Sequence, residues 1–260
     1  MKLAILGTGM IAKEALPMLK KISGIEITAL LSSKKSLPAA QSLAKSFDIS
    51  SVYDDFDKLL RDESCDTVYI TLPNHLHFEY AKQALQHKKH VICEKPFTDT
   101  LDQLVVLEKL AIENNIFLFE AITTIHQNNY NLIKSNLSRL GEIRLVELNF
   151  SQYSSRYDAF KNGEILPVFD AKKSGGALKD LNIYNIHFVV GLFGLPHVIS
   201  YYSTLQKNVD TSGVLILDYK MFKAVLIAAK DSSSSFFSKI QGEEGWMEIT
   251  SPINDLDILI

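Results

Sequence analysis

Short hydrophobic runs alternate with longer amphipathic stretches through the first half of the chain. The short runs predict strands at 3–6, 25–31, 67–71, 90–93 and 116–120. The stretches between them repeat apolar residues every three or four positions and predict helices ending near 21, 47, 86 and 114, with a short amphipathic segment at 53–61. Alternation at this spacing is typical of right-handed βαβ units, so residues 1–122 are expected to form a doubly wound parallel α/β sheet.

A different pattern begins near residue 123. A helix near 130–140 leads into a strand at 142–150, a polar loop at 151–173 and a helix at 176–193. Extended runs then follow one another without helices between them, at 198–205, 213–219, 224–229, 235–241 and 246–250. Consecutive strands of this kind favour an antiparallel sheet with one covered face, so residues 123–260 are expected to form a second, α+β domain.

Composition and charge narrow the range of functions. Hydrophobic residues make up 47% of the 260 residues, which argues against a disordered chain. A net charge of -3 and a pI of about 6.2 give no basic surface for nucleic acid or an anionic membrane. No apolar run approaches the ~20 residues that span a bilayer, and the apolar start reaches glycine too early for a signal peptide. Two cysteines form no disulfide framework, so we expect a cytoplasmic protein.

A glycine-rich turn follows the first predicted strand. Gly7-Thr8-Gly9-Met10-Ile11-Ala12 has glycine where the chain turns and where a pyrophosphate approaches, and a small residue where helix and strand pack together. The helix start that follows offers N–H groups and a positive dipole end to phosphate. These six residues are therefore predicted to bind a dinucleotide in a Rossmann domain at 1–122; an ordinary strand-to-helix turn is the alternative.

The end of the second predicted strand bears on which dinucleotide binds. An acidic residue there would bond the ribose 2′-hydroxyl and repel a 2′-phosphate, but the chain has Ser32-Ser33-Lys34-Lys35. Hydroxyl and ammonium groups suit a phosphate, so Ser33 and Lys34 are predicted to favour NADP(H) over NAD(H). A solvated lysine pair without a ligand is the other interpretation.

The third predicted strand leads into a polar loop and a helix. Leu72, Pro73 and Asn74 are predicted to lie over the cofactor. His77, in the first turn of the helix, is equally compatible with cofactor contact and with a structural role, whereas His75 is expected at the surface.

The triplet Glu94-Lys95-Pro96 follows the fourth predicted strand. Proline ends the strand because it cannot donate to the ladder, so a charged pair is placed directly at the strand end. In open α/β sheets ligands bind at this carboxyl edge. Glu94 and Lys95 are therefore predicted to lie at the cofactor site.

Three polar side chains recur along the helix predicted at 176–193. Asp180, Tyr184 and His187 stand at positions i, i+4 and i+7 among mostly apolar neighbours, which places them on one stripe. Proton-transferring groups on a largely buried helix need partners or a cleft. The stripe is either a satisfied core network or a catalytic cluster, and the availability of Lys95 favours catalysis.

Five motifs together resemble one family. They occur in the order Gly7-x-Gly9-x-x-Ala12, Pro73-Asn74-x-x-His77, Glu94-Lys95-Pro96, Glu120-Ala121 and Gly175-Gly176-Ala177-Leu178-x-Asp180-x-x-x-Tyr184. The chain thus resembles the glucose–fructose oxidoreductase / inositol dehydrogenase (Gfo/Idh/MocA) family over essentially its whole length, and Tyr184 is similar to its dihydrodiol dehydrogenase branch. The resemblance implies a cis peptide bond after Lys95, and homodimers or homotetramers formed through the sheet of the second domain.

The predicted function is that of an NAD(P)-dependent oxidoreductase acting on the hydroxyl or carbonyl group of a small sugar, polyol or cyclic diol. Lys95 would stabilise the alkoxide. Tyr184, whose ordinary pKa is about 10, would act as the acid–base beside that cation. Asp180 would orient Lys95 or the substrate, and His187 is the alternative base. We expect residues 123–260 to bind substrate and to mediate oligomerisation, without a metal.

Two other functions fit parts of the pattern. A nucleotide-sensing regulator, similar to the galactose-pathway repressors, would bind the cofactor without turnover, but the retention of Lys95, Asp180 and Tyr184 argues against it. An NAD-dependent glycosidase is disfavoured because no acidic residue follows the second strand. Relatives commonly continue beyond a segment like 245–249, so the chain is either a shorter variant or lacks its last strands.

Overall fold

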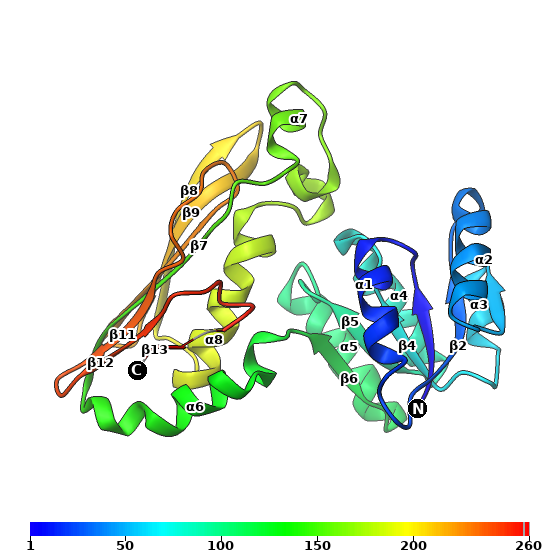
Figure 1. Cartoon of the computed structure of the whole chain (residues 1–260), viewed down its shortest axis with the longest axis horizontal. Helices are drawn as coiled ribbons and strands as arrows, with labels where there is room; N and C mark the ends of the chain where they lie inside the picture. The colour runs from blue at the N-terminus through cyan, green and yellow to red at the C-terminus, as the bar shows by residue number, and fades with distance from the viewer. Residues whose placement is uncertain (257, 260) are drawn as a thin grey trace. The chain divides into compact units, whose positions relative to one another are not determined.

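The computed structural model describes residues 1–256 and 258–259, with side chains up to residue 256. The chain divides into two compact units, Met1–Ala121 and Ile122–Ile260. Each unit contains one sheet with its own helices (Figure 1). Among the helices described, none is long and apolar enough to cross a membrane.

A six-stranded parallel sheet forms the first unit, in the order β3-β2-β1-β4-β5-β6. Its strands are β1 (Lys2–Leu6), β2 (Glu26–Leu31), β3 (Ser51–Tyr53), β4 (Thr67–Ile70), β5 (His90–Glu94) and β6 (Leu118–Ala121). Its α-helices are α1 (Met10–Leu19), α2 (Leu37–Ser46), α3 (Phe56–Leu60), α4 (His77–Gln86) and α5 (Leu101–Asn114). The predicted doubly wound sheet is confirmed. The short strand β3 was not predicted, because its three half-buried residues carry no apolar run.

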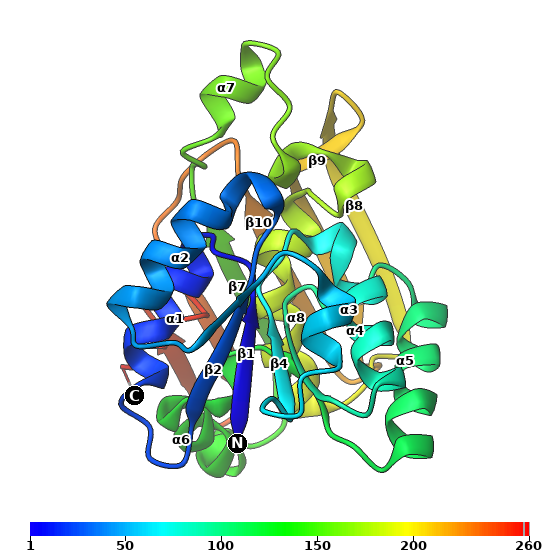
Figure 2. The same cartoon turned by 90° about the vertical axis from the view of Figure 1, so that its right-hand side faces the viewer.

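Alternate residues of β1 face two cores on opposite sides of this sheet. Leu3 and Ile5 pack with residues of α1 and α2, whereas Ala4 and Leu6 pack with residues of α3, α4 and α5. Figure 2 shows these two sets of helices on either side of the strands. All four side chains are fully buried, so β1 has no polar position after its exposed first residue, Lys2, as expected of a parallel sheet covered on both faces.

A seven-stranded sheet forms the second unit, in the order β13-β12-β11-β7-β10-β9-β8. Its strands are β7 (Ile143–Ser151), β8 (Val198–Gln206), β9 (Val209–Asp218), β10 (Lys223–Ala229), β11 (Ser238–Gly242), β12 (Trp246–Ile249) and β13 (Ile258–Leu259). Neighbouring strands are antiparallel except β7 and β10, which are parallel. The predicted antiparallel sheet is therefore confirmed as a mostly antiparallel one.

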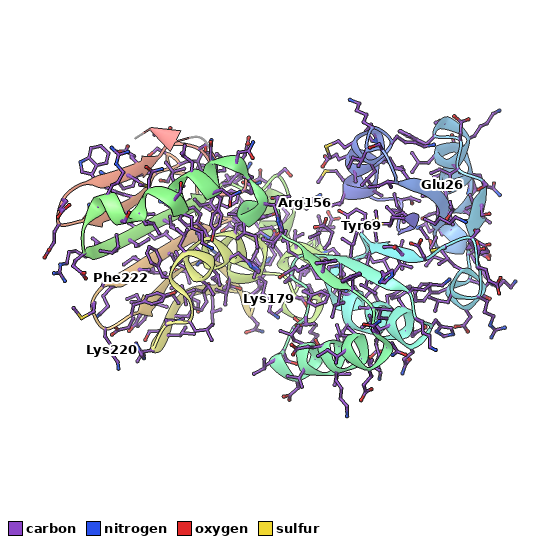
Figure 3. The ribbon with its side chains drawn as sticks, turned by 90° about the horizontal axis from the view of Figure 1, so that it is seen from below. Glu26, Tyr69, Arg156, Lys179, Lys220 and Phe222 are labelled. Atoms are coloured by element: carbon purple, nitrogen blue, oxygen red, sulfur yellow. The ribbon has the colours of Figure 1, made fainter. Side chains whose placement is uncertain are left out.

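Helices α6 (Asn128–Asn136) and α8 (Ile183–Phe193) cover one face of this second sheet (Figure 1). Tyr130 of α6 and Phe188 of α8 meet edge to face, with ring centroids 5.6 Å apart, above core residues of β7, β9 and β10. Burial raises the pKa of Tyr130 to about 12. At the end of α8, the ring of Phe193 packs against the ring of Phe222 in the turn between β9 and β10, with ring centroids 5.0 Å apart. Figure 3 labels Phe222 and Lys220 of this turn.

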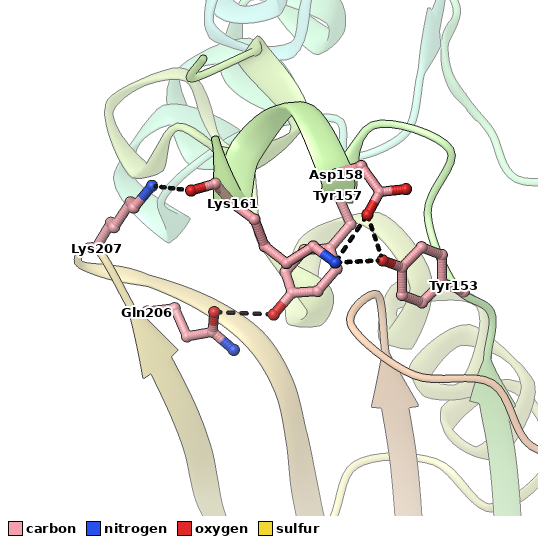
Figure 4. A network of polar contacts seen from close by, with 6 residues as sticks. All are labelled: Tyr153, Tyr157, Asp158, Lys161, Gln206 and Lys207. Atoms are coloured by element: carbon pink, nitrogen blue, oxygen red, sulfur yellow. Dashed lines mark hydrogen bonds and ion pairs between the residues drawn. The ribbon is translucent and has the colours of Figure 1, made fainter. Parts of the chain in front are cut away.

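The stretch predicted as a polar loop contains a helix and an aromatic core. We call residues 152–173 the α7 segment, after its helix α7 (Tyr157–Lys161). Tyr157, Phe160 and Phe169 are buried together, and the last two rings stack 4.8 Å apart. Lys161 bonds Asp158 at 2.7 Å within a polar network on the outside of the helix (Figure 4). The sequence did not show this, because the aromatic residues are spread among polar ones without a regular period.

Candidate active site

Strand β1 ends in a turn that requires glycine. Gly7 has φ +112°, and a Cβ on it would lie 2.9 Å from the Thr71 hydroxyl oxygen. Its N–H donates to the Leu31 carbonyl at 2.9 Å, which aligns the ends of β1 and β2. An alanine here would be strained and would collide with the chain that leaves β4.

The helix that begins after this turn has space and donors for a phosphate. Gly9, the N-cap of α1, provides no side-chain cap, and a Cβ on it would meet nothing within 4 Å. Thr8 is half-buried, Met10 and Ile11 are exposed, and the buried Ala12 lets the helix pack closely on the sheet. The first N–H groups of a helix have no acceptor within the helix, and the dipole favours an anion there, so the turn fits a pyrophosphate.

The end of β2 presents hydroxyl and ammonium groups. Ser33 and Lys34 are exposed, whereas Ser32 is buried. The Ser33 hydroxyl accepts a bond from the Ser36 N–H at 3.3 Å and caps the short 3-10 turn that follows. A 2′-phosphate at residues 32–36 would meet hydroxyl groups and a cation, without a carboxylate in that segment.

His77 is enclosed and does not present its ring to a ligand. Its side chain is at the start of α4 and only 1% of the residue is exposed. Its Nδ1 lies 2.8 Å from the Pro96 carbonyl oxygen, and its Nε2 lies 2.8 Å from the Leu72 carbonyl oxygen. Direct cofactor contact, one of its two interpretations, does not fit this geometry; the ring instead ties the loop after β4 to the loop after β5. Leu72 and Asn74 are half-buried, and Pro73 is exposed.

The chain around Lys95 is held on both sides. The peptide bond after Lys95 is cis, which confirms the expectation from the resemblance. Before it, Glu94 accepts a 2.5 Å bond from the Tyr69 hydroxyl, and after it the Phe97 N–H donates to Glu120 at 3.1 Å. The half-buried Lys95 side chain therefore leaves the sheet from a fixed stretch of backbone.

These segments lie along one edge of the first sheet. In the strand register, Leu6 pairs with Leu31 and with Ile70, and Ile70 pairs with Cys93. Because the strands are parallel, the glycine turn, Ser33 and Lys95 all follow carboxyl ends at the same level. This edge is where α/β sheets bind ligands.

In the second unit, the helix that carries Asp180 begins with a π-turn. Residues Leu178–Asn182 are π-helical, where an α-helix was predicted throughout 176–193. Asp210 of β9 accepts a bond from the Leu178 N–H at 2.7 Å, and a Cβ on Gly176, at φ +118°, would collide with that carboxylate. Single π-turns are frequent at functional sites, so the irregular start marks this helix as a candidate.

A cation that the sequence reasoning missed lies against Asp180. Lys230 directly follows β10, and 2% of its side chain is exposed, against 27% for Asp180. Its ammonium bonds Asp180 Oδ2 at 2.6 Å and the Val168 carbonyl at 2.8 Å, and lies 4.6 Å from the centroid of the Phe169 ring. A signal was present: a lysine directly after an apolar strand is the same pattern that singled out Lys95.

Tyr184 and His187 follow on α8, and both are half-buried. The Tyr184 ring packs against Phe150, with centroids 5.8 Å apart. Asn182 and Asn185 are fully buried, and their amides donate to carbonyl oxygens of β10 at 3.2 and 3.1 Å. The helix is thus buried at these two positions through polar side chains, whose hydrogen bonds fix its rotation.

The two units thus supply different chemistry. The first offers phosphate donors and a lysine at one sheet edge; the second offers a carboxylate paired with a buried ammonium, followed one turn later by a phenol. Across the part of the chain described, no group of three or more His, Cys, Asp or Glu side chains could hold a metal ion.

Residues 1–121 match the model of a family described as "Oxidoreductase family, NAD-binding Rossmann fold". The chain is 35% identical over 249 residues to scyllo-inositol 2-dehydrogenase (NADP(+)) IolU of Bacillus subtilis (strain 168), covering 95% of this chain and 75% of the relative. It is 25% identical over 256 residues to trans-1,2-dihydrobenzene-1,2-diol dehydrogenase of Xenopus tropicalis, covering 96% of this chain and 75% of the relative.

Among solved structures, KijD10, a 3-ketoreductase from Actinomadura kijaniata in complex with NADP and TDP-benzene, has a TM-score of 0.85. At 24% identity, over 97% of this chain and 77% of that chain, the likeness shows a shared fold. Membership rests instead on the family model and on the 35% identity with the Bacillus subtilis protein. The chain therefore belongs to the Gfo/Idh/MocA family of NAD-binding oxidoreductases.

Proposed function

We propose that this protein is an NADP-preferring dehydrogenase or reductase that interconverts a hydroxyl and a carbonyl group on a small sugar, polyol or cyclic diol. The observation that carries the proposal is the carboxyl edge of the first sheet, where an uncapped helix start, Ser33 with Lys34, and Lys95 occur together. The names of relatives support the substrate class, since they include an inositol dehydrogenase, a D-xylose 1-dehydrogenase and a dihydrobenzenediol dehydrogenase.

The residues at this edge fit the cofactor. The turn at 7–12 would hold the pyrophosphate through backbone N–H groups, and Ser33 and Lys34 would hold the 2′-phosphate. Bound NADP(H) supplies the hydride acceptor for oxidation or the hydride donor for reduction. Leu72, Pro73 and Asn74 would cover it, and Glu94, bonded to Tyr69, would border it.

The remaining roles concern the substrate oxygen. Lys95 stabilises the negative charge that develops on this oxygen, which is the largest single contribution in many enzymes of this kind. Tyr184, as the phenolate, accepts the hydroxyl proton during oxidation, and as the phenol it returns that proton during reduction. Asp180 orients the reacting groups, and His187, one turn further, is the alternative base.

Cofactor choice tests the first half of the proposal. Titration followed by the fluorescence of the reduced nicotinamide should show NADPH binding more tightly than NADH. Ser33→Asp should reverse this order, because a carboxylate repels the 2′-phosphate. Ser46→Asp, the same change at the exposed far end of α2, is the matched control and should leave the order unchanged. Equal affinities, or tighter binding of NADH, would contradict the NADP preference.

Turnover tests the second half. NADPH oxidation should be screened against aldoses, ketoses and diketones, and NADP+ reduction against inositols and cyclic diols. With the best substrate, Tyr184→Phe should lower kcat by about 10²–10⁴-fold, as expected for loss of a general acid–base, while NADPH affinity barely changes. His187→Asn should do much less. If the two variants exchange behaviour, His187 is the base; if the protein binds NADPH but turns nothing over, the regulator alternative is favoured.

A further inference from the structure

Lys230 occupies a position that lysine rarely holds. Lysine is almost never fully buried unless its charge is paired. Here 2% of the side chain is exposed. Its backbone is also fixed, because its N–H donates to the Thr211 carbonyl at 2.7 Å and its carbonyl accepts from the Ser154 N–H at 2.9 Å. The ammonium is thus held at a defined point between β10, the α7 segment and the π-turn.

The ammonium joins two parts of the second unit. It bonds the Asp180 carboxylate at 2.6 Å on the π-turn. It also bonds the Val168 carbonyl at 2.8 Å and lies over the Phe169 ring, both in the α7 segment. The neighbouring carboxylate of Asp231 is engaged elsewhere, since it accepts bonds from the hydroxyl groups of Thr211 and Ser212.

This geometry has two chemical consequences for Asp180. A buried cation at hydrogen-bond distance favours the ionised carboxylate. It also restricts where the other carboxylate oxygen, Oδ1, points, because Oδ2 is held by Lys230. A carboxylate paired in this way has no proton to donate and is weakened as a base, so the transferred proton falls to another group, and Tyr184 lies one helical turn further along.

We propose that Lys230 is a positioning residue of the reaction, which keeps Asp180 ionised and correctly oriented and which couples the conformation of the α7 segment to that carboxylate. This inference rests on the proposed function. Lys230 acts only through Asp180, and every effect of removing it on the reaction depends on Asp180 being present.

The test is a double-variant comparison of Lys230→Met with Asp180→Asn. Lys230→Met should lower kcat by about 10–10²-fold, the size of effect that a misplaced group produces, and should move the acidic limb of the pH–rate profile to higher pH. Lys230→Arg, which keeps the charge, should restore part of the rate. Lys207→Met is the matched control, because the Lys207 ammonium also bonds a backbone carbonyl of the α7 segment and lies 4.9 Å from the centroid of the Phe160 ring. This variant should change neither kcat nor the pH–rate profile.

Lys230→Met on its own can fold poorly, because it leaves the charge of Asp180 without its cation. The combined variant, Lys230→Met with Asp180→Asn, avoids this problem because it removes both charges. Asp180→Asn with and without Lys230→Met should then have equal residual kcat. A further loss in the combined variant, or an unchanged rate and pH profile for a folded Lys230→Met, would overturn the proposal.

A readout that needs no turnover separates this inference from the proposed function. The ¹³C signal of the Asp180 carboxyl, identified by its loss in Asp180→Asn, should titrate at higher pH in Lys230→Met than in the unmodified protein. If that difference is present but no substrate is turned over, the ion pair stands and the proposed function fails. If the signals titrate together, Lys230 does not set the ionisation of Asp180 and the proposal is overturned.

Discussion

Replacing Asp210 by alanine should destabilise the second unit through the start of the helix that carries Asp180. The Oδ2 atom of Asp210 accepts two hydrogen bonds, from the Leu178 N–H and from the Tyr201 hydroxyl, each at 2.7 Å. The first of these bonds holds the N-terminal end of the π-turn, and the second reaches across from β8. Alanine would leave the backbone donor and a half-buried phenol without this acceptor.

The expected magnitude follows from these two contacts. A hydrogen bond to a charged group contributes about 1.5–3 kcal/mol, and an anion at a helix start adds about 0.3–1 kcal/mol. Because the site is half-buried and such contributions are not additive, we expect Asp210→Ala to cost about 2–4 kcal/mol. Tyr201→Phe, which removes only one of the bonds, should cost about 1–2 kcal/mol.

Urea unfolding followed by tryptophan fluorescence measures this cost in the second unit, because the chain has one tryptophan, Trp246, and it lies in β12. Asp218→Ala is the control on the same strand: its carboxylate forms an ion pair with Lys223 near the surface, so the loss should be clearly smaller than that of Asp210→Ala. In the double variant, Asp210→Ala with Tyr201→Phe should cost less than the sum of the two changes. A cost under about 0.5 kcal/mol for Asp210→Ala, or strict additivity, would show that the Asp210 carboxylate does not hold the start of the helix.

Three further outcomes are expected. Burial, together with the hydrogen bond to Asp210 and the charge of Asp210, raises the pKa of Tyr201. The bond between Tyr201 and Asp210 therefore stabilises the fold fully below the unfolded pKa of about 10, and this stabilisation is lost as the pH rises through the folded pKa. Tyr201→Phe should accordingly flatten the alkaline decline in the free energy of unfolding. Burial also raises the pKa of Cys65, and that of Cys93 well above its ordinary value, so neither thiol should react with a disulfide reagent at pH 8 until urea unfolds the chain. Light scattering at micromolar concentration should show a dimer or tetramer formed through the exposed face of the second sheet, and a monomer would contradict this.

The elements that were predicted best have long, uniform patterns. Helices α4 and α5 end at the residues expected from the sequence, 86 and 114, because each combines a clear apolar period with a marked end. The elements that were missed are short and lack a period. Strand β3 is stabilised by pairing with β2, and helix α7 by aromatic residues from outside the helix, so neither is specified by its own residues.

In the candidate site, too, the sequence identified only features that depend on residues next to each other in the chain. The glycine turn and Lys95 were identified because their local surroundings, a buried strand followed by a turn, are visible in the sequence. The partners of a charge are not visible in this way: Lys230 bonds Asp180 across 50 positions, and Asp210 reaches Leu178 across 32. These residues are far apart in the sequence and come together only through the strand order, which places β10 and β9 beneath the start of the helix.

A charged residue in or directly after a buried strand still carries a definite implication. Such a charge must be desolvated, so it persists only where another element supplies a partner or where a ligand does. Lys95, Lys230 and Asp210 all meet this description, and the last two have their partners within the second unit. The pattern therefore predicts that a tertiary partner exists, and the topology determines which residue it is; applied to Lys230, it identifies the cation on which the orientation of Asp180 depends.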